Sequence, residues 1–449
     1  MNVTPHKKSR LSSLVAVLAV IGAISVACKD TAPPPPALPK TLKTFKHLVM
    51  IVSDSFRPDL FTLQGLEYRP AEMTAKLADQ SVVFENAYAQ GTTPASSYMS
   101  LMTSTHVRTH GVDIADGEAL PRAGICGRSD LTLLSEVLAE NGFETTAAVA
   151  TRQLSPKAGF PRGFRRWNRA DVSKFATMKY RDDYTKLKPN DDKTIRYVGE
   201  AAFSAWTKSS ARQFLYVHFA GPELPYAPSE LARSILDIAT VKTDYDAETI
   251  AAAVSKDDKK ELEHIRRAYL AEIWEMDKHI YHLLFQLKEN HLEDDTVVVV
   301  TGNRGVRFYA PTKTGVDDIY AKVPLIVHVP GEAPRTVRRP VGHIDVAPTM
   351  LRLLGIEKKP ASWQGTDLFA ETGHPVVTER LSTTAVRLSP EVRMGFDSSG
   401  TPGPLGGDAV PGDVERRRLE KAYKQWQETV PKGGADTSAA PTGMCRDGD

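Results

Sequence analysis

Two apolar runs are followed closely by polar residues whose side chains could do chemistry. Asp54 comes directly after the run His47–Ser53, and Asn303 and Arg304 come shortly after the run Thr296–Thr301. Carboxylate and amide oxygens are ligands that a hard divalent cation accepts, whereas a guanidinium has no lone pair to give and stays protonated. The sequence therefore places potential cation ligands beside a fixed positive charge, and the elements that carry them determine which chemistry is possible.

Continuous apolar runs of this kind are typical of strands that are buried on both faces of a parallel sheet. They are His47–Ser53, Thr145–Ala150, Phe214–Phe219, Thr296–Thr301 and Val323–Val329. Helical patterns cover Leu131–Asn141, Thr194–Lys208, about Lys256 to Asn290, and Val346–Leu354. The alternation predicts an α/β fold, with a mostly parallel central sheet and helices on both faces. Ligands bind such sheets outside the carboxyl ends of the strands, where Asp54, Gly221 and Asn303 fall.

The composition indicates a globular protein with no affinity for nucleic acid. The 449 residues are 41% hydrophobic, which is enough for a large core. The 57 basic residues nearly balance the 55 acidic ones, so the basic stripe of a nucleic-acid-binding protein is not expected.

The first 28 residues read as a lipoprotein signal peptide. A basic start precedes the apolar run Leu11–Ala27, which is short for a membrane span and suits a secretory signal. The run leads to Cys28 in a sequence that resembles a bacterial lipobox, although an ordinary signal peptide or an uncleaved anchor is also possible. A lipid on Cys28 would make the membrane a partner, and Lys29 after it favours the outer membrane or the cell surface in the cell envelope.

The remaining chain divides into four parts. Residues 29–44 are a Pro-rich tether, 45–375 the α/β domain, 376–430 a reduced C-terminal subdomain with a charged helix near Val414–Thr429, and 431–449 a disordered tail. Cys126 and Cys445 could pair in an oxidising compartment or remain separate thiols.

Five segments resemble, in order, motifs of the sulfatase family of the alkaline phosphatase superfamily. They are His47–Asp59, Leu101–Val112, Ala268–Thr296, Tyr320–Gly331 and His343–Ile356. The strand that leads to Asn303 and Arg304 also resembles the family's strand ending in Thr-Ser-Asp-His-Gly-Glu. The resemblance implies an alkaline phosphatase/sulfatase-like fold, with sulfuric ester hydrolysis as the family's activity.

The family resemblance also implies a divalent cation, usually calcium, held by two Asp residues after the first strand and by an Asp with a His or Asn after the later one. The matching positions here are Asp54, Ser55, Asn303 and Arg304. Asp54 is the one carboxylate at these four positions, and its negative charge and the positive charge of Arg304 give the four positions a net charge of about zero. We therefore expect a metal-free site, with calcium present only if the site is active. We also expect Arg304 to pair with Asp54, because a buried lone carboxylate is costly.

The family's nucleophile aligns without a gap on Pro94, which has no nucleophilic atom. Hydroxyl side chains flank it at Thr92, Thr93, Ser96 and Ser97. They either supply a shifted nucleophile or cap a helix that starts near Tyr98.

Two further positions match family site residues. The family's sulfate-contacting His is here Glu223, which repels sulfate and either pairs with Arg304 or is a solvated loop residue. His110 matches the family's His-Gly, and we expect it to have a structural role rather than a catalytic one.

Two functions remain open. The first is a sulfatase-like envelope lipoprotein that is a pseudoenzyme and binds an anionic, sulfated or phosphorylated ligand. The alternative is an active sulfuric or phosphoric ester hydrolase, in which a shifted Thr or Ser is the nucleophile and Arg304 stabilises the charge that the metal would stabilise.

Overall fold

The structure is a computed structural model. It describes residues 44–433 apart from 62–69, 115–124, 126–127, 152, 155, 169–191, 223, 237, 239–244, 308–314 and 407–410. The expectations for Cys28, Glu223, Cys126 and Cys445, and for nearly all of the tether and the tail, therefore lie outside the described residues. All the described residues belong to one compact unit. Among the helices that the structure describes, none is long and apolar enough to cross a membrane.

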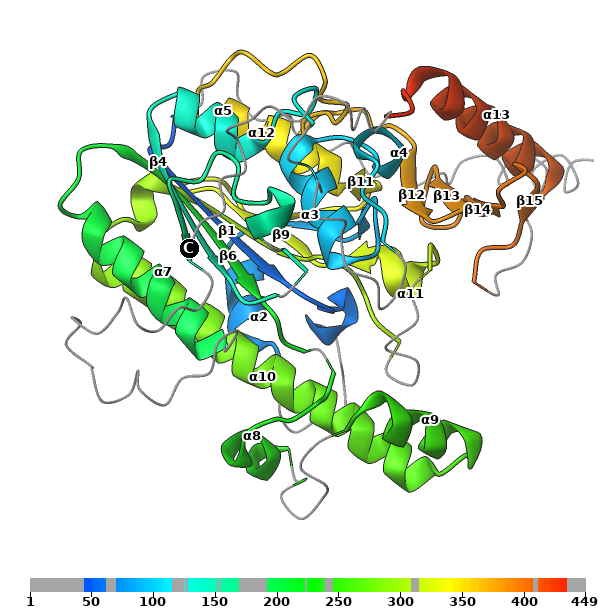
Figure 1. Cartoon of the computed structure of the whole chain (residues 1–449), viewed down its shortest axis with the longest axis horizontal. Coiled ribbons are helices and arrows are strands. Elements are labelled where there is room, and N and C mark those ends of the chain that lie inside the picture. Colours follow the sequence, from blue (N-terminus) through cyan, green and yellow to red (C-terminus); the bar gives the residue numbers. More distant parts are fainter. Residues whose placement is uncertain are drawn as a thin grey trace, which may run out of the picture. The chain divides into compact units, whose positions relative to one another are not determined.

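An eight-stranded sheet forms the centre of the fold, in the order β10-β2-β9-β7-β1-β6-β4-β5 (Figure 1). Its strands are β1 (His47–Ser53), β2 (Val82–Phe84), β4 (Phe143–Val149), β5 (Arg166–Asn168), β6 (Arg212–Phe219), β7 (Thr296–Gly302), β9 (Leu325–His328) and β10 (Arg335–Val337). Every neighbouring pair is parallel except those that β9 makes with β7 and β2. The mostly parallel sheet predicted from the sequence is confirmed.

Helices cover both faces of this sheet. The helices of this part of the chain are α2 (Glu72–Ala78), α3 (Pro94–Thr103), α4 (Val107–His110), α5 (Leu134–Glu140), α7 (Asp192–Trp206), α8 (Glu230–Ile235), α9 (Ala247–Ser255), α10 (Lys259–Glu289), α11 (Asp318–Ala321) and α12 (Val346–Leu353). Of these, α8 and α9 lie beyond the sheet, beside one end of α10 (Figure 1). Alternate residues of β1 point to opposite faces, so Met50 packs in the core beneath α3, α5 and α12. Its neighbour Ile51 packs in the core beneath α2, α7 and α10. Both faces of the predicted central strand are therefore buried, as its continuous apolar run indicates.

Two of the differences from the expected boundaries arise at proline residues. The run Val323–Val329 is two strands, β8 (Lys322–Val323) and β9, because Pro324 between them has no N–H to donate to a ladder. The helix expected near Tyr98 begins four residues earlier, at Pro94, where the missing N–H of proline costs nothing in the first helical turn.

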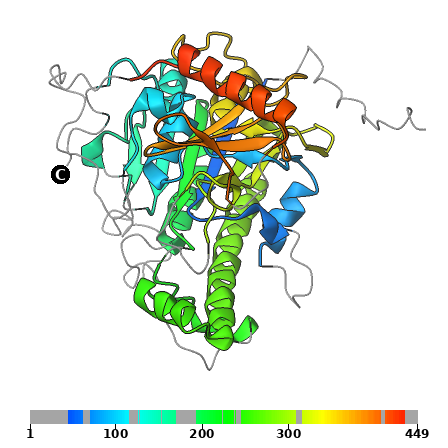
Figure 2. The same ribbon diagram turned by 90° about the vertical axis from the view of Figure 1, so that its right-hand side faces the viewer.

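The C-terminal residues form a separate antiparallel sheet of β12 (Val376–Arg380), β13 (Thr383–Arg387), β14 (Arg393–Phe396) and β15 (Pro402–Gly403). Helix α13 (Asp413–Thr429) lies across this sheet (Figure 2). The two short strands β3 (Ala87–Tyr88) and β11 (Val341–Gly342) join β8 in a third sheet.

Candidate functional site

The carboxyl ends of three neighbouring strands bring the candidate ligand positions together. Strand β1 lies between β6 and β7, and its last residue, Ser53, is in register with Phe219 and Gly302. Beyond the strands, the Asp54 N–H donates to the Phe219 carbonyl (3.1 Å) and the Asn303 N–H donates to the Ser53 carbonyl (2.9 Å). Asp54 and Asn303 therefore converge at one edge of the sheet.

Asp54 is fully buried, and two donors contact one oxygen of its carboxylate. His218 Nε2 lies 2.8 Å from Oδ1 of Asp54, and the side-chain N–H₂ of Asn303 donates to the same oxygen. Both Asp54 and His218 are 0% exposed. The other carboxylate oxygen, Oδ2, has no hydrogen-bond partner among the described residues. Two nitrogen donors, one from His218 and one from Asn303, therefore face Oδ1 of Asp54, where a cation would need oxygen ligands.

The contact with His218 extends into the core. The Tyr216 hydroxyl lies 2.8 Å from His218 Nδ1, and the Tyr216 ring packs edge-on against Tyr98 of α3. Nε2 must carry the proton that bonds Asp54, so Nδ1 accepts from Tyr216 in a neutral ring or donates to it in an imidazolium. Sequence reasoning missed His218, since a single His within an apolar run is usually a core residue. The available signal is the spacing of Tyr216 and His218, which puts both on one face of β6.

Ser55 and Asn303 make a second pair of contacts at this edge. Ser55 has a positive φ of 52°, and its N–H donates to Asn303 Oδ1 at 3.2 Å. The Tyr269 hydroxyl donates to the Ser55 carbonyl at 2.7 Å. The amide of Asn303 thus points its oxygen at a backbone donor and its nitrogen at Asp54.

The residues at these four positions do not fit calcium. Calcium takes six to eight oxygen ligands, several of them charged. At these positions, the side-chain oxygens without a hydrogen-bond partner among the described residues are Asp54 Oδ2 and Ser55 Oγ. The described residues also hold no cluster of three or more His, Cys, Asp or Glu suited to a metal. One carboxylate already bonded to two donors is a poor site for a hard divalent ion.

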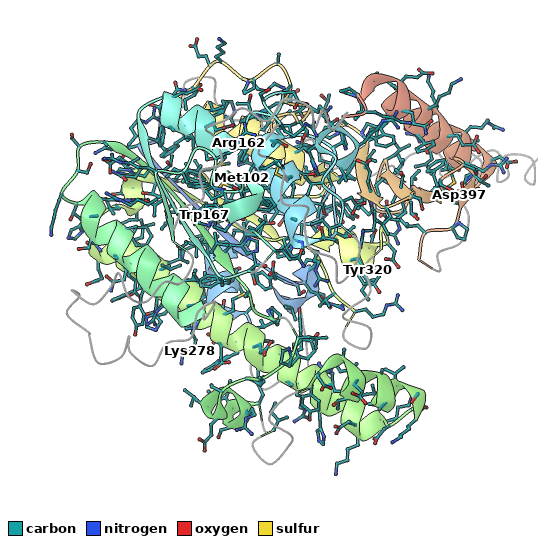
Figure 3. All side chains as sticks on the ribbon, viewed as in Figure 1. Met102, Arg162, Trp167, Lys278, Tyr320 and Asp397 are labelled. Carbon is teal, nitrogen blue, oxygen red and sulfur yellow. The ribbon has the colours of Figure 1, made fainter. Side chains whose placement is uncertain are left out.

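Arg304 does not pair with Asp54, and that expectation is wrong for the part of the chain that the structure describes. The side chain from a neighbouring strand that bonds Asp54 is His218 instead. After Asn303 the Gly305 N–H donates at 2.8 Å to the carbonyl of Tyr320. Tyr320 belongs to α11 and is labelled in Figure 3. Burial raises the pKa of the Tyr320 hydroxyl, and the positive charges of Arg307 and Arg304 oppose that rise. Arg304 is 8% exposed and so places a buried positive charge near α11.

Three of the four candidate hydroxyls are committed to other bonds. Thr93 is the N-cap of α3, where its hydroxyl accepts from the Ser96 N–H (3.2 Å) and the Ser96 hydroxyl accepts from the Thr93 N–H (3.1 Å). The Ser97 hydroxyl lies 3.2 Å from His343 Nδ1. By contrast, the buried Thr92 hydroxyl has no hydrogen-bond partner within the described residues.

His343 is a weak candidate for a base that activates Ser97. Its Nε2 lies 3.1 Å from the Thr301 hydroxyl, which itself donates to the Pro324 carbonyl. Nε2–H therefore donates to Thr301, and Nδ1 accepts from Ser97. Burial lowers the pKa of His343 to about 4, whereas a general base works best with a pKa near the working pH.

His110 links α3 to α4. Its Nδ1 accepts from the Val112 N–H at 3.0 Å, so Nε2 carries the proton and bonds the Ser100 hydroxyl, also at 3.0 Å. Burial lowers its pKa to about 3. With both nitrogens bonded inside the fold, the geometry suits a structural role.

Glu379 connects the C-terminal sheet to the loop that carries these hydroxyls. Its N–H donates to the Gln90 carbonyl at 2.7 Å, and Gly91 next to Thr92 bridges to it. Its carboxylate accepts from the Arg108 N–H at the start of α4, at 3.0 and 3.1 Å. Burial raises the pKa of Glu379 to about 8.

This pKa predicts a pH-dependent stability. The folded pKa lies above the ordinary value of 4.5, so the folded state keeps a proton that the unfolded state releases. The contribution of Glu379 to the free energy of unfolding should therefore fall by a few kcal/mol between about pH 4.5 and pH 8 and then level off. Urea denaturation from pH 5 to 9 should show this fall in the wild type and its absence in Glu379→Gln. The exposed Glu371→Gln serves as the control, and parallel pH profiles for wild type and Glu379→Gln would contradict the assignment.

Comparisons with known proteins agree with this fold. The family model described as Sulfatase matches residues 46–356. The inner membrane protein YejM of Salmonella typhimurium is 28% identical over 149 residues, which are 32% of this chain and a quarter of that relative. A protein solved in complex with its substrate D-glucosamine-2-N,6-O-disulfate has a TM-score of 0.66 at 14% identity, covering 87% of this chain and 99% of its own. The phosphonate monoester hydrolase of Agrobacterium radiobacter has a TM-score of 0.62 at 16% identity, covering 86% and 95%.

Proposed function

The chain belongs to the sulfatase family, and from that membership we propose that it is an envelope-anchored pseudoenzyme that binds an anionic ligand. The observation that carries the proposal is the carboxylate of Asp54, which accepts from His218 and Asn303 where the family holds a cation. A fold can persist when its site changes, so the activity has to be judged from these residues.

Electrostatics support an anionic ligand over a metal. Asp54 is the one carboxylate at the four ligand positions, and Arg304 brings a buried positive charge close to them in sequence. A cation already in a partly buried site repels a second one by several kcal/mol at an intermediate dielectric. A guanidinium instead donates to sulfate or phosphate oxygens, which are the groups that the family's fold accommodates.

An assay of the purified chain with an aryl sulfate and with a bis-phosphate ester tests this proposal. We expect no turnover above the uncatalysed rate, with or without added calcium, while a sulfated or phosphorylated ligand still raises the melting temperature by binding the folded state. Turnover that a chelator abolishes would overturn the pseudoenzyme proposal.

The second candidate function is a metal-independent hydrolase, and the hydroxyl of Thr92 favours it. That hydroxyl is buried beside the N-cap of α3 without a described partner, whereas Thr93, Ser96 and Ser97 are committed. Arg304 would then stabilise the transition-state charge. Chelator-resistant turnover that is lost in Thr92→Val and kept in Ser97→Ala would establish this alternative.

The location is part of the proposal. A relative that is an inner membrane protein supports a place in the cell envelope, and the lipobox-like Cys28 supports a lipid anchor at the outer membrane or cell surface. Labelling cells with a fatty-acid analogue should therefore mark the wild type and leave Cys28→Ala unmarked. Equal labelling of both chains, or of neither, would remove the lipoprotein assignment.

A further inference from the structure

Two arginines of the C-terminal sheet lie directly opposite each other. Arg387 and Arg393 are paired residues in the register of β13 and β14. Like charges in this arrangement destabilise a sheet. The Arg387 side chain is also 0% exposed, and a buried charge without a partner is costly. The two guanidinium groups therefore need an anionic partner.

Asp318, the first residue of α11, is that partner. Its Oδ1 accepts from Arg387 Nε at 2.9 Å, and its Oδ2 accepts from Arg393 at 2.7 Å. The guanidinium carbon of Arg387 lies 4.4 Å from the centre of the Tyr88 ring, and the same guanidinium donates to the Thr378 hydroxyl at 3.0 Å. These contacts fix the direction of the Arg387 side chain and, through it, the position of the Asp318 carboxylate.

Helix α11 depends on such contacts from outside. It is a single turn of four residues, and the side chain of its N-cap residue, Asp317, makes no capping hydrogen bond. One turn of helix is unstable alone, because fixing its backbone costs more than its few hydrogen bonds return. Next to β3, the Ala89 N–H donates to the Ala321 carbonyl at 2.9 Å and holds the end of the helix. The bonds of Asp318 to the two arginines hold its start.

The segment that carries Arg304 packs on this helix. The Gly305 N–H donates to the Tyr320 carbonyl at 2.8 Å. A Cβ at Gly305 would come within 2.3 Å of the Ile319 carbonyl oxygen, so this close approach requires glycine. A displacement of α11 would therefore move the residue that follows Arg304.

We infer that the contacts of Asp318 with the two arginines position Arg304, so that the C-terminal sheet sets the affinity of the candidate site for its anion. The connection is continuous, since hydrogen bonds join Arg387 to Asp318 and α11 to Gly305. Without the charge of Asp318, the start of α11 is held less firmly and Arg304 takes more positions. Binding an anion then includes the cost of ordering that side chain. The effect on affinity rests on the anion binding proposed above.

Hydrogen exchange of the purified chain tests this connection without a ligand. Mass spectrometry of peptides that cover residues 303–306 should show the Gly305 amide exchanging about tenfold faster in Asp318→Asn, because the start of α11 loses its bonds to two charged groups. The Asn303 amide donates to Ser53 of β1 and should exchange as in the wild type. Arg393→Gln removes one ion pair and keeps the buried one, so it should give a smaller change in the same direction at a smaller cost in stability.

The matched control is Asp113→Asn. Asp113 pairs with Arg380 of the same sheet at 2.9 Å, and the Arg380 side chain is 4% exposed. This pair joins the C-terminal sheet to the chain after α4 and not to α11. The control should lose stability and keep the slow exchange of Gly305. Unchanged exchange of Gly305 in Asp318→Asn, or equal acceleration in Asp113→Asn, would overturn the inference.

Titration with inorganic sulfate measures the consequence for binding. Asp318→Asn should raise the Kd for sulfate about tenfold and have no further effect in the Arg304→Gln background, because the loss acts through Arg304. An equal loss in both backgrounds would contradict the positioning role. Absence of sulfate binding by the wild type would count against the proposed function, whereas the exchange of Gly305 still decides whether Asp318 holds the segment of Arg304.

Discussion

Replacing His218 by Ala is expected to destabilise the protein by about 3–5 kcal/mol, because it leaves the carboxylate of Asp54 buried without its paired donor. His218 and Asp54 are both 0% exposed and their bonded atoms are 2.8 Å apart. Urea denaturation of the wild type and the variant measures the loss.

A double-mutant cycle separates the pair from the cavity that each truncation leaves. Asp54→Ala/His218→Ala should cost less than the two single losses added, with a coupling of about 1–3 kcal/mol. His47, a buried histidine at the opposite end of β1 that stacks on Trp206, supplies the control. Asp54→Ala and His47→Ala lie about 20 Å apart along the strand and should be additive. Additive losses for Asp54 and His218 would show that their contact contributes nothing.

The triple change Ser55→Asp, Asn303→Asp and Arg304→His is expected to create measurable calcium binding where the wild type has none. The three changes take the four ligand positions from a net charge of about zero to about minus three and remove both the guanidinium and the amide donor that bonds Asp54. Isothermal titration should give a dissociation constant of about 0.1–1 mM, as in weak protein calcium sites. Adding Asp54→Ala to the triple variant should abolish the binding. Unchanged affinity in that quadruple variant would place the ion elsewhere.

Much of the fold was predictable because the central strands are buried on both faces. The runs His47–Ser53 and Thr296–Thr301 match β1 and β7 to within a residue, since a strand with no solvent face has no polar alternation to blur its ends. The run Val323–Val329 was wrongly predicted to be one strand, because a pattern of apolar residues takes no account of the missing N–H of Pro324. Resemblance of five short motifs also identified the family correctly.

The partner of Asp54 was not predictable from the same signals. Asp54 and Arg304 follow strands that are neighbours in the sheet, but β1 has a second neighbour, β6, that contributes His218 from within an apolar run. Whether β6 or β7 supplies the partner of the Asp54 carboxylate depends on the direction in which the side chains at the end of each strand point. Here the hydrogen bond from the Gly305 N–H to the Tyr320 carbonyl holds the chain after Asn303 close to α11. The imidazole of His218 bonds Asp54 instead.

The central claim is that protein donors hold one oxygen of the Asp54 carboxylate, Oδ1, and that the site needs no cation. The most direct measurement is the metal content of the purified chain by plasma mass spectrometry, together with its melting temperature before and after a chelator. We predict far less than one equivalent of calcium, magnesium, manganese or zinc per chain, and an unchanged melting temperature. One tightly bound divalent ion per chain, or a melting temperature that falls when the ion is removed, would contradict the account.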